Sequence, residues 1–139
     1  MSVLYTANAR TAGGREGHVQ TDDGLLSLDL AMPKSLGGKG NATNPEQLFA
    51  AGYAACFESA VRHVARLQKL PLADASVASS VSLSQNAEGG FALSVALAVE
   101  TKGLDQATAE ELVATAHRVC PYSNAVRGNI DVALTVQVA

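Results

Sequence analysis

The chain has 139 residues, the usual length of one domain, and we expect a single domain over residues 1–139. Its 10 Lys and Arg against 13 Asp and Glu give a net charge of −3, so it lacks the basic excess that nucleic-acid binding requires. No stretch reaches the roughly 18 apolar residues of a membrane span, and the N-terminus has no signal-peptide pattern. We therefore expect a soluble, cytoplasmic protein that binds neither nucleic acid nor membrane.

The first predicted element is a β-hairpin over residues 18–30. Its turn signal is the pair Asp23-Gly24, and apolar residues then alternate with polar ones at Leu26, Leu28 and Leu30. This alternation is typical of a strand with one buried face. The segment MPKSLGGKGNAT, which collects a proline and several glycines, predicts a loop before the first helix.

A long helix is predicted from Asn44, its N-cap, to about Leu70. A proline occupies the first helical position, Gln47 is placed to close a capping box, and Pro71 stops the helix. The first half, residues 48–57, is apolar on every side, which is typical of a helix surrounded by protein. Because one small domain rarely surrounds a long helix by itself, we expect a subunit interface here.

The rest of the chain predicts a second hairpin, a second helix and a last strand. The hairpin strands, residues 75–85 and 91–99, are joined by the turn NAEGG. The second helix starts at Asp105 as N-cap and ends before Pro121, and alternating apolar residues over 130–138 predict the last strand. The order β-β-α-β-β-α-β indicates an α+β fold with two β-sheets, a long central helix and a second helix.

The chain has two cysteines, Cys56 inside the long helix and Cys120 at the end of the second helix. A buried free cysteine is commonly an inert hydrophobic residue, and only a nearby cation would ionise it, because burial alone raises the pKa of a thiol. Two cysteines are too few for a structural framework, so a disulfide between them is expected to be catalytic. The carbonyl end of a helix disfavours a thiolate, which suits Cys120 to resolving rather than attacking.

Arg15 and Glu46 are the candidate charged partners of a reactive thiol. Arg15 lies in the glycine-flanked loop AGGREGHV and could reach inward, although a solvated loop arginine is the alternative. Glu46 suits the helix dipole where it stands, and it is also well placed to hold a buried arginine.

The sequence gives little support for a metal site or a nucleotide site. His117 and Cys120 are spaced to chelate together, but His18 and His63 lie on a strand and on the charged end of the long helix, so a third ligand is missing. We therefore expect no metal site. No phosphate-binding loop, GxSxG elbow or dinucleotide fingerprint is present.

Two segments, NPEQLFAAGYAACF around Cys56 and VCPYSNAVRGN around Cys120, resemble the organic hydroperoxide resistance proteins, within the wider family of osmotically inducible proteins. The resemblance covers essentially the whole chain, including the GGREGHV loop. It implies a thiol peroxidase without metal, haem, flavin or other cofactor, whereas the expectation of an intertwined homodimer comes from the helix surface and not from the motifs. By motif, Cys56 is the implied peroxidatic cysteine, Cys120 the resolving cysteine, and Arg15 with Glu46 the pair that ionises Cys56 and positions the peroxide.

In the implied reaction, the Cys56 thiolate attacks a peroxide oxygen, releases an alcohol and becomes a sulfenic acid, which Cys120 converts to a disulfide. The resemblance suggests that dihydrolipoamide, free or on a lipoylated protein, reduces this disulfide. Apolar residues near the cysteines predict a pocket that favours alkyl or lipid hydroperoxides over hydrogen peroxide: Leu48, Phe49, Tyr53, Phe57 and Tyr122. The alternatives are a non-catalytic binding protein for a small hydrophobic ligand and an oxidoreductase acting on protein thiols, against which the buried cysteines argue.

The position of Glu46 raises a geometric problem. On one continuous helix it lies roughly 15 Å along the axis from Cys56, too far for one arginine head to touch both. Either the helix breaks near Gly52, or an antiparallel copy from a second subunit brings its own Glu46 to Cys56. The apolar surface of residues 48–57 favours a homodimer with two shared sites.

Overall fold

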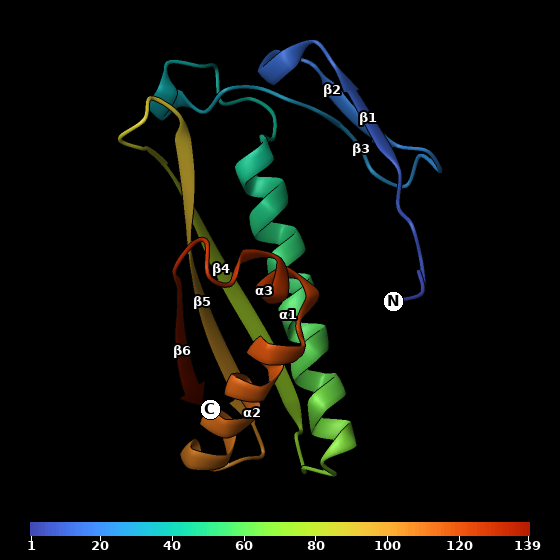
Figure 1. The fold of residues 1–139 in the computed structure, drawn as a ribbon, viewed down its shortest axis with the longest axis vertical. Coiled ribbons are helices and arrows are strands. Elements are labelled where there is room, and N and C mark those ends of the chain that lie inside the picture. The colour runs from blue at the N-terminus through green and yellow to red at the C-terminus, as the bar shows by residue number, and fades with distance from the viewer. The chain divides into compact units, whose positions relative to one another are not determined.

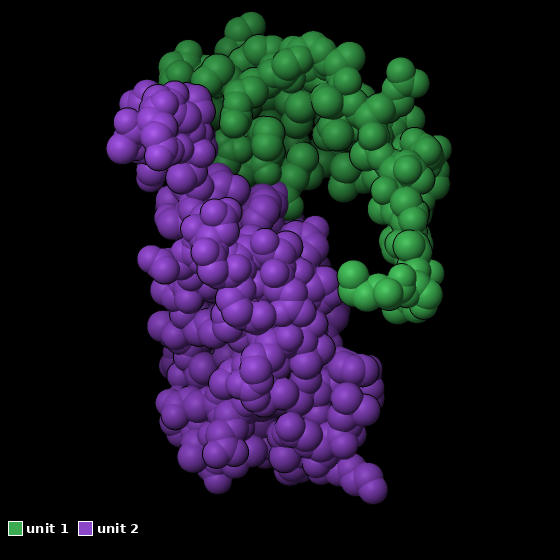
Figure 2. Space-filling model, in the orientation of Figure 1, with its two compact units in different colours: residues 1–48 green, residues 49–139 purple.

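The computed structural model describes all residues from Met1 to Ala139 and contains two compact units, residues 1–48 and residues 49–139 (Figure 2). The boundary between them falls inside the long helix α1 (Pro45–Leu67). The expectation of one domain over the whole chain stays a prediction. None of the helices combines the length and the apolar character that crossing a lipid bilayer requires.

Unit 1 is built on a three-stranded antiparallel sheet of β1 (Ala9–Ala12), β2 (His18–Thr21) and β3 (Ser27–Asp29). The predicted hairpin is confirmed as β2 and β3. Strand β1, which pairs with β2, was not predicted, because small and polar residues give it no clear alternation. The expected buried face is only half covered, since Leu26 and Leu28 are each 37% exposed.

Helix α1 begins as the sequence predicts and ends earlier. The Asn44 side chain accepts a hydrogen bond from the backbone N–H of Gln47 at 2.9 Å, which confirms the N-cap. The Gln47 side chain accepts from the Thr43 hydroxyl instead of closing a capping box, so that part of the prediction is wrong. The helix ends at Leu67, before the proline is reached, because Lys69 adopts a left-handed conformation with φ 54°.

The sheet of unit 2 contains two long strands and one shorter strand. Strands β4 (Asp74–Gln85) and β5 (Phe91–Lys102) form the predicted hairpin, and β6 (Val132–Val138) pairs with β5 in parallel. Between β5 and β6 lie α2 (Gln106–Val119) and α3 (Pro121–Val126). The α+β class with two sheets is confirmed, and the order differs from the prediction only by the added β1, α3 and two short 3₁₀ turns.

The core of unit 2 lies between one face of its sheet and the helices α1 and α2, which cover that face (Figure 1). Along β5 the odd-numbered residues Val95, Leu97 and Val99 are buried and their neighbours are exposed, as the alternation predicts. Each fully buried apolar side chain contributes about 1.5–3 kcal/mol relative to exposure. The helices supply further large or β-branched residues that are almost fully buried: Tyr53, Phe57, Val61, Leu112 and Val113.

Candidate active site

The two cysteine sulfurs are neighbours in unit 2. Sγ of Cys120 lies 3.5 Å from Sγ of Cys56, and both side chains are free thiols. This distance is a contact between thiols and not a bond, which would measure roughly 2.05 Å. Cys56 is partly exposed and Cys120 is completely buried. A dissolved reactant therefore meets Cys56 first.

A break between two helices places Cys120. Helix α2 ends at Val119, Cys120 itself is extended with φ −59° and ψ 124°, and α3 begins at Pro121. The Cys120 N–H donates to the carbonyl of Ala116 at 2.8 Å, and its carbonyl accepts from the N–H of Asn124 at 3.0 Å. Both helices thus satisfy the backbone of Cys120 while its side chain contacts Cys56. Pro121 was predicted to stop a helix, and it also starts one, because proline suits the first helical position.

Burial raises the pKa of the Cys56 thiol. The backbone N–H of Tyr122, which hydrogen-bonds the sulfur, lowers this pKa in part, and the Cys120 thiol raises it further. Within unit 2, no cation is among the groups that shift this pKa. Unit 2 by itself therefore leaves Cys56 less acidic than an ordinary cysteine.

Arg15 and Glu46 form an ion pair within unit 1. Nη1 and Nη2 of Arg15 lie 3.0 and 3.3 Å from the two carboxylate oxygens of Glu46, a two-pronged arrangement that fixes the guanidinium plane. Arg15 is presented by a 3₁₀ turn, Gly14–Glu16, and Gly13 before it has φ 88°, which a residue with a side chain rarely adopts. The structure thus joins two of the predicted site residues, and Nη1 of Arg15 makes no well-angled hydrogen bond.

Four of the predicted pocket residues form an aromatic cluster in unit 2: Phe49, Tyr53, Phe57 and Tyr122. Tyr53 and Tyr122 have ring centroids 5.7 Å apart, and Phe49 meets both rings at about 6 Å. Tyr53 and Phe57 are completely buried, whereas Tyr122 is 38% exposed. Phe49 and Tyr122 are thus the more accessible members of this cluster, the fifth predicted residue, Leu48, is half-buried in unit 1, and the substrate pocket itself stays a prediction.

Gly52 has a packing role that the sequence analysis did not find. A Cβ atom at this position would lie 2.7 Å from the hydroxyl of Tyr122 and 3.2 Å from its ring. The absence of a side chain therefore lets Tyr122 lie against α1. The helix continues through Gly52 without interruption, so the alternative in which it breaks there is excluded.

A buried hydrogen-bond chain also escaped the sequence analysis. The hydroxyl of Ser123 lies 2.6 Å from the Tyr53 hydroxyl and 2.9 Å from Nδ1 of His117. It joins three helices, since Tyr53 lies on α1, His117 on α2 and Ser123 on α3. The only sequence signal was a serine in the motif after Cys120.

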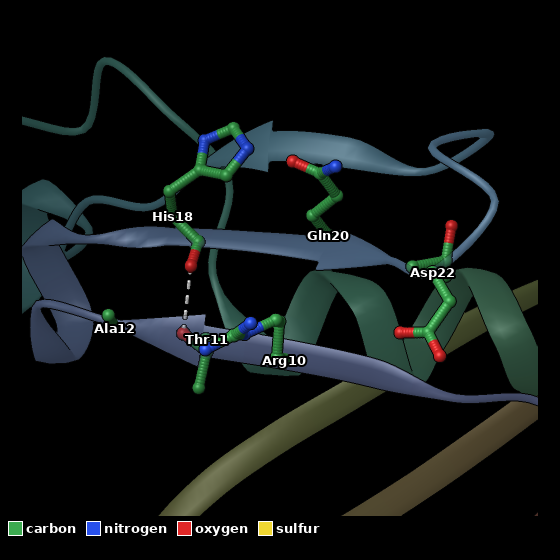
Figure 3. Close-up of a pocket in the computed structure, with 7 residues that line it drawn as sticks. Arg10, Thr11, Ala12, His18, Gln20 and Asp22 are labelled. Atoms are coloured by element: carbon green, nitrogen blue, oxygen red, sulfur yellow. Dashed lines mark hydrogen bonds between the residues drawn. The ribbon is translucent and has the colours of Figure 1, made fainter.

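A hollow of about 520 Å³ lies on unit 1 over β1 and β2, and Figure 3 shows its polar lining. The hydroxyl of Thr11 donates to the carbonyl of His18 at 3.0 Å within it. None of the predicted site residues lines this hollow, whose residues are Arg10, Thr11, Ala12, His18, Gln20, Thr21 and Asp22.

Two of the three histidines, His18 and His117, have polar partners other than a metal. His117 contacts Ser123, and His18 lies 2.8 Å from Asp29 and 2.9 Å from the hydroxyl of Ser27. No group of three or more His, Cys, Asp or Glu side chains converges to hold a metal ion.

Comparison with known proteins identifies the family of this chain. Residues 38–135 match the family model of the OsmC-like proteins. The chain is 49% identical over 136 residues to the organic hydroperoxide resistance protein OhrB of Bacillus subtilis, covering 97% of this chain and 99% of that one. It is 53% identical over 136 residues to an organic hydroperoxide resistance protein of Xanthomonas axonopodis pv. citri, covering 96% and 95%.

Solved structures give the same result. An organic hydroperoxide resistance protein from Legionella pneumophila superimposes with a TM-score of 0.97 at 65% identity, covering 99% of this chain and all of that one. A Vibrio cholerae relative, which holds captopril in one of its active sites, gives 0.95 at 56% identity, covering 98% and 94%. The chain belongs to the OsmC-like family, and within it to the organic hydroperoxide resistance proteins.

Proposed function

We propose that this chain is a cysteine-based peroxidase that reduces organic hydroperoxides to alcohols. The observation that carries the proposal is the pair of free thiols 3.5 Å apart, one partly exposed and one buried. This arrangement suits a first oxidation at Cys56 that is followed at once by disulfide formation with Cys120. The names of the close relatives support organic hydroperoxides as the substrate class.

In the proposed reaction, the Cys56 thiolate attacks one oxygen of the peroxide and the O–O bond breaks. The alkoxide that leaves takes up a proton to become an alcohol, and Cys56 becomes a sulfenic acid. The sulfur of Cys120 then attacks the sulfenic sulfur, and the Cys120 proton leaves with the hydroxyl group as water. A dithiol restores both thiols and is itself oxidised to a disulfide.

Arg15 is the proposed cation for Cys56. Because burial raises the pKa of this thiol and the Tyr122 amide opposes it only in part, a positive charge is needed for reaction near neutral pH. Glu46 would hold the Arg15 guanidinium in a fixed plane, and the Nη1 atom that lacks a well-angled hydrogen bond could donate to the peroxide oxygen.

We also propose that the active form is a homodimer with two shared sites. Since α1 is continuous, Glu46 and Cys56 of one chain remain roughly 15 Å apart along the helix axis. An antiparallel α1 from a second copy would bring the partner's Arg15–Glu46 pair to Cys56 and cover the apolar first half of the helix. The two chains of the dimer would then each complete the other's site.

Subunit mixing tests this shared site. Heterodimers of a Cys56→Ser chain and a Glu46→Ala chain should contain one site without a thiol and one intact site, and so keep about half of the wild-type activity. If Glu46 serves the cysteine of its own chain, one site lacks a thiol and the other lacks Glu46, and activity falls to about half that of the Glu46→Ala homodimer. The two homodimers provide the reference values.

Thiol titration tests the peroxidase itself. One equivalent of tert-butyl hydroperoxide should remove both thiols of each chain together and release one equivalent of alcohol. A binding protein for a small hydrophobic ligand, the second candidate function, keeps both thiols. The aromatic side chains of Phe49 and of Tyr122, whose backbone N–H hydrogen-bonds Cys56, predict faster reaction with alkyl or lipid hydroperoxides than with hydrogen peroxide.

Dihydrolipoamide, free or on a lipoylated protein, is the proposed reductant. Turnover with alkyl hydroperoxide should be sustained by dihydrolipoamide and not by thioredoxin, whose protein surface must reach a completely buried Cys120. A dithiol-dependent cycle needs a reducing compartment, and we therefore propose that the protein acts in the cytoplasm.

A further inference from the structure

Ser123 is a completely buried hydroxyl that connects the segment after Cys120 to two other helices. It lies 2.6 Å from the hydroxyl of Tyr53 and 2.9 Å from Nδ1 of His117. Ser123 is on the first turn of α3, which starts directly after Cys120. Its hydrogen bonds therefore act close to the resolving cysteine.

His117 holds α3 at its other end as well. The guanidinium of Arg127, the residue after α3, donates through Nη2 to the backbone carbonyl of His117 and through Nη1 to the side chain of Asn124 at 2.6 Å. The short helix is thus tied to α2 near its first turn and just beyond its last. The Ser123 hydroxyl also reaches α1, the helix that carries Cys56, as does the backbone N–H of Tyr122.

The donors and acceptors of the hydrogen bonds between Tyr53, Ser123 and His117 agree with the protonation states of these residues. Burial raises the pKa of Tyr53, which therefore remains a phenol and donates to Ser123. Burial, together with the charge of Arg127, lowers the pKa of His117, so the neutral ring can accept at Nδ1. The Ser123 hydroxyl can then accept from the Tyr53 hydroxyl and donate to Nδ1 of His117.

We propose that Ser123 is a positioning residue that keeps Cys120 at attack distance from Cys56, and that it thereby sets how much of the oxidised protein becomes disulfide rather than sulfinic acid. The proposal rests on the peroxidase function proposed above. Ser123 touches no reacting atom and acts by fixing α3 against the helices that carry both thiols.

The two fates of the Cys56 sulfenic acid have different requirements. Disulfide formation needs the Cys120 sulfur to move from 3.5 Å to bonding distance, and it releases water. Sulfinic acid forms when a second hydroperoxide molecule transfers an oxygen atom to the sulfenic sulfur and leaves as alcohol, an irreversible loss of the thiol. Any loosening of the Cys120 segment slows the first reaction and leaves the second unchanged.

The test measures the ratio of the two products. Wild-type protein and Ser123→Ala are treated with graded tert-butyl hydroperoxide without reductant, and intact mass separates the disulfide from the sulfinic acid. Both products form from the same sulfenic acid, so the ratio does not depend on how fast Cys56 is first oxidised. In Ser123→Ala, the peroxide concentration that gives equal amounts should fall about tenfold, because the variant loses the hydroxyl that hydrogen-bonds both Tyr53 and His117.

Two further variants identify the hydrogen-bond chain as the cause. Tyr53→Phe removes only one hydroxyl and should shift the ratio in the same direction, and the double variant should be no worse than Ser123→Ala alone, because both act on one chain. His117→Asn keeps a side-chain acceptor and should stay closer to wild type than His117→Ala. If Ser123→Ala does not fold, the ratio of disulfide to sulfinic acid in Tyr53→Phe tests the proposal by itself.

Val113→Ala is the matched control, because it opens a cavity in the same unit without removing any hydrogen bond between Tyr53, Ser123 and His117. Its product ratio should equal that of wild type. The proposal is overturned if Ser123→Ala and Tyr53→Phe keep the wild-type ratio, or if Val113→Ala shifts it as much as they do. If wild-type protein forms neither product, the peroxidase function fails, and this is seen before any variant is compared.

Discussion

The two sheets of this protein differ in what they bury. In unit 2, β4 and β5 have 12 residues each, and the inward residues of β5 from Val95 onward are at most 4% exposed as far as Thr101. In unit 1, the strands have 4, 4 and 3 residues, and none of those residues is buried. Most of the large apolar residues that remain exposed are in unit 1: Met1, Val3, Leu4, Tyr5, Leu25, Leu26, Leu28 and Leu36.

The two units therefore contribute to the candidate site in different ways. Unit 2 has its own core and holds both thiols, and its stability can be explained by side chains within one chain. Unit 1 holds the charged pair and has an exposed apolar surface. A second copy of the chain is the partner that would cover it, in agreement with the proposed shared site.

The largest effect is expected from the thiols of unit 2. Cys56→Ser should abolish peroxide consumption, because it removes the attacking sulfur. Cys120→Ser should react once and accumulate sulfenic acid, since the resolving step is lost. Stopped-flow oxidation with trapping of the sulfenic acid measures both. Equal single-turnover rates in the two variants would contradict the division of roles.

A pair of leucine substitutions tests the contrast between the sheets directly. Leu97→Ala, in β5, should lower the free energy of unfolding by about 3 kcal/mol, because the side chain is fully buried. Leu28→Ala, in β3, should cost less than about 1 kcal/mol in an isolated chain. Urea denaturation measures both values.

Unfolding of the two leucine variants at several protein concentrations tests whether a second copy covers the sheet of unit 1. If a second copy covers the sheet of unit 1, the midpoint of unfolding rises with protein concentration, and Leu28→Ala weakens this dependence. Equal losses for Leu97→Ala and Leu28→Ala in a monomeric protein would show that the two sheets do not differ in this way.

The charged pair of unit 1 should have a smaller effect than the thiols. Arg15→Ala is expected to slow the first oxidation by about 10- to 100-fold and to raise the pKa of Cys56, because a cation that favours the thiolate is removed. Arg15→Lys should recover part of the rate, since lysine lacks the planar fork.

The pH dependence of Cys56 alkylation measures this pKa. Arg10→Ala, on β1 of the same unit, is the control, because Arg10 does not pair with Glu46. An unchanged alkylation profile in Arg15→Ala counts against the ionising role of Arg15.

The smallest expected effect is a pH dependence in unit 2. Burial and the charge of Arg127 lower the pKa of His117 in the folded state. The stability that the neutral ring supplies is therefore complete above the unfolded pKa of about 6.5 and is lost as pH falls through the lower folded pKa.

The size of this loss should stay below about 1 kcal/mol, because the ring is only partly buried. Urea unfolding of wild type and His117→Asn at about pH 7 and about pH 5 measures it. The variant should lose less stability between the two pH values, and an identical loss would remove His117 as the cause.

Local signals in the sequence predicted most of the elements correctly. Asn44 and Asp105 cap helices with the expected side-chain hydrogen bonds, because N-cap chemistry involves only neighbouring residues. The long strands of unit 2 were found because their apolar side chains alternate over many residues. Strand β1 and helix α3 were missed, since each is short and carries no strong periodicity.

The candidate site was only partly predictable, because some of its contacts depend on the tertiary fold. The motifs predicted all four charged and thiol residues of the site. In the structure Cys56 contacts Cys120 in unit 2, and Arg15 pairs with Glu46 in unit 1. The Tyr122 amide and the Ser123 hydroxyl act through atoms that only the tertiary fold brings near, across three helices. Gly52 was interpreted as a possible break, although its role is to leave space for Tyr122.

The parallel pairing of β6 with β5 has a consequence for folding during synthesis. A parallel pair needs a crossover, and here α2, Cys120 and α3 together form it. Cys56 emerges from the ribosome before β6, so in the nascent chain Cys120 is not yet held next to it. The contacts that close the crossover are distant in sequence and form slowly. We therefore expect a disulfide between Cys56 and Cys120 to form efficiently only after the last strand has docked.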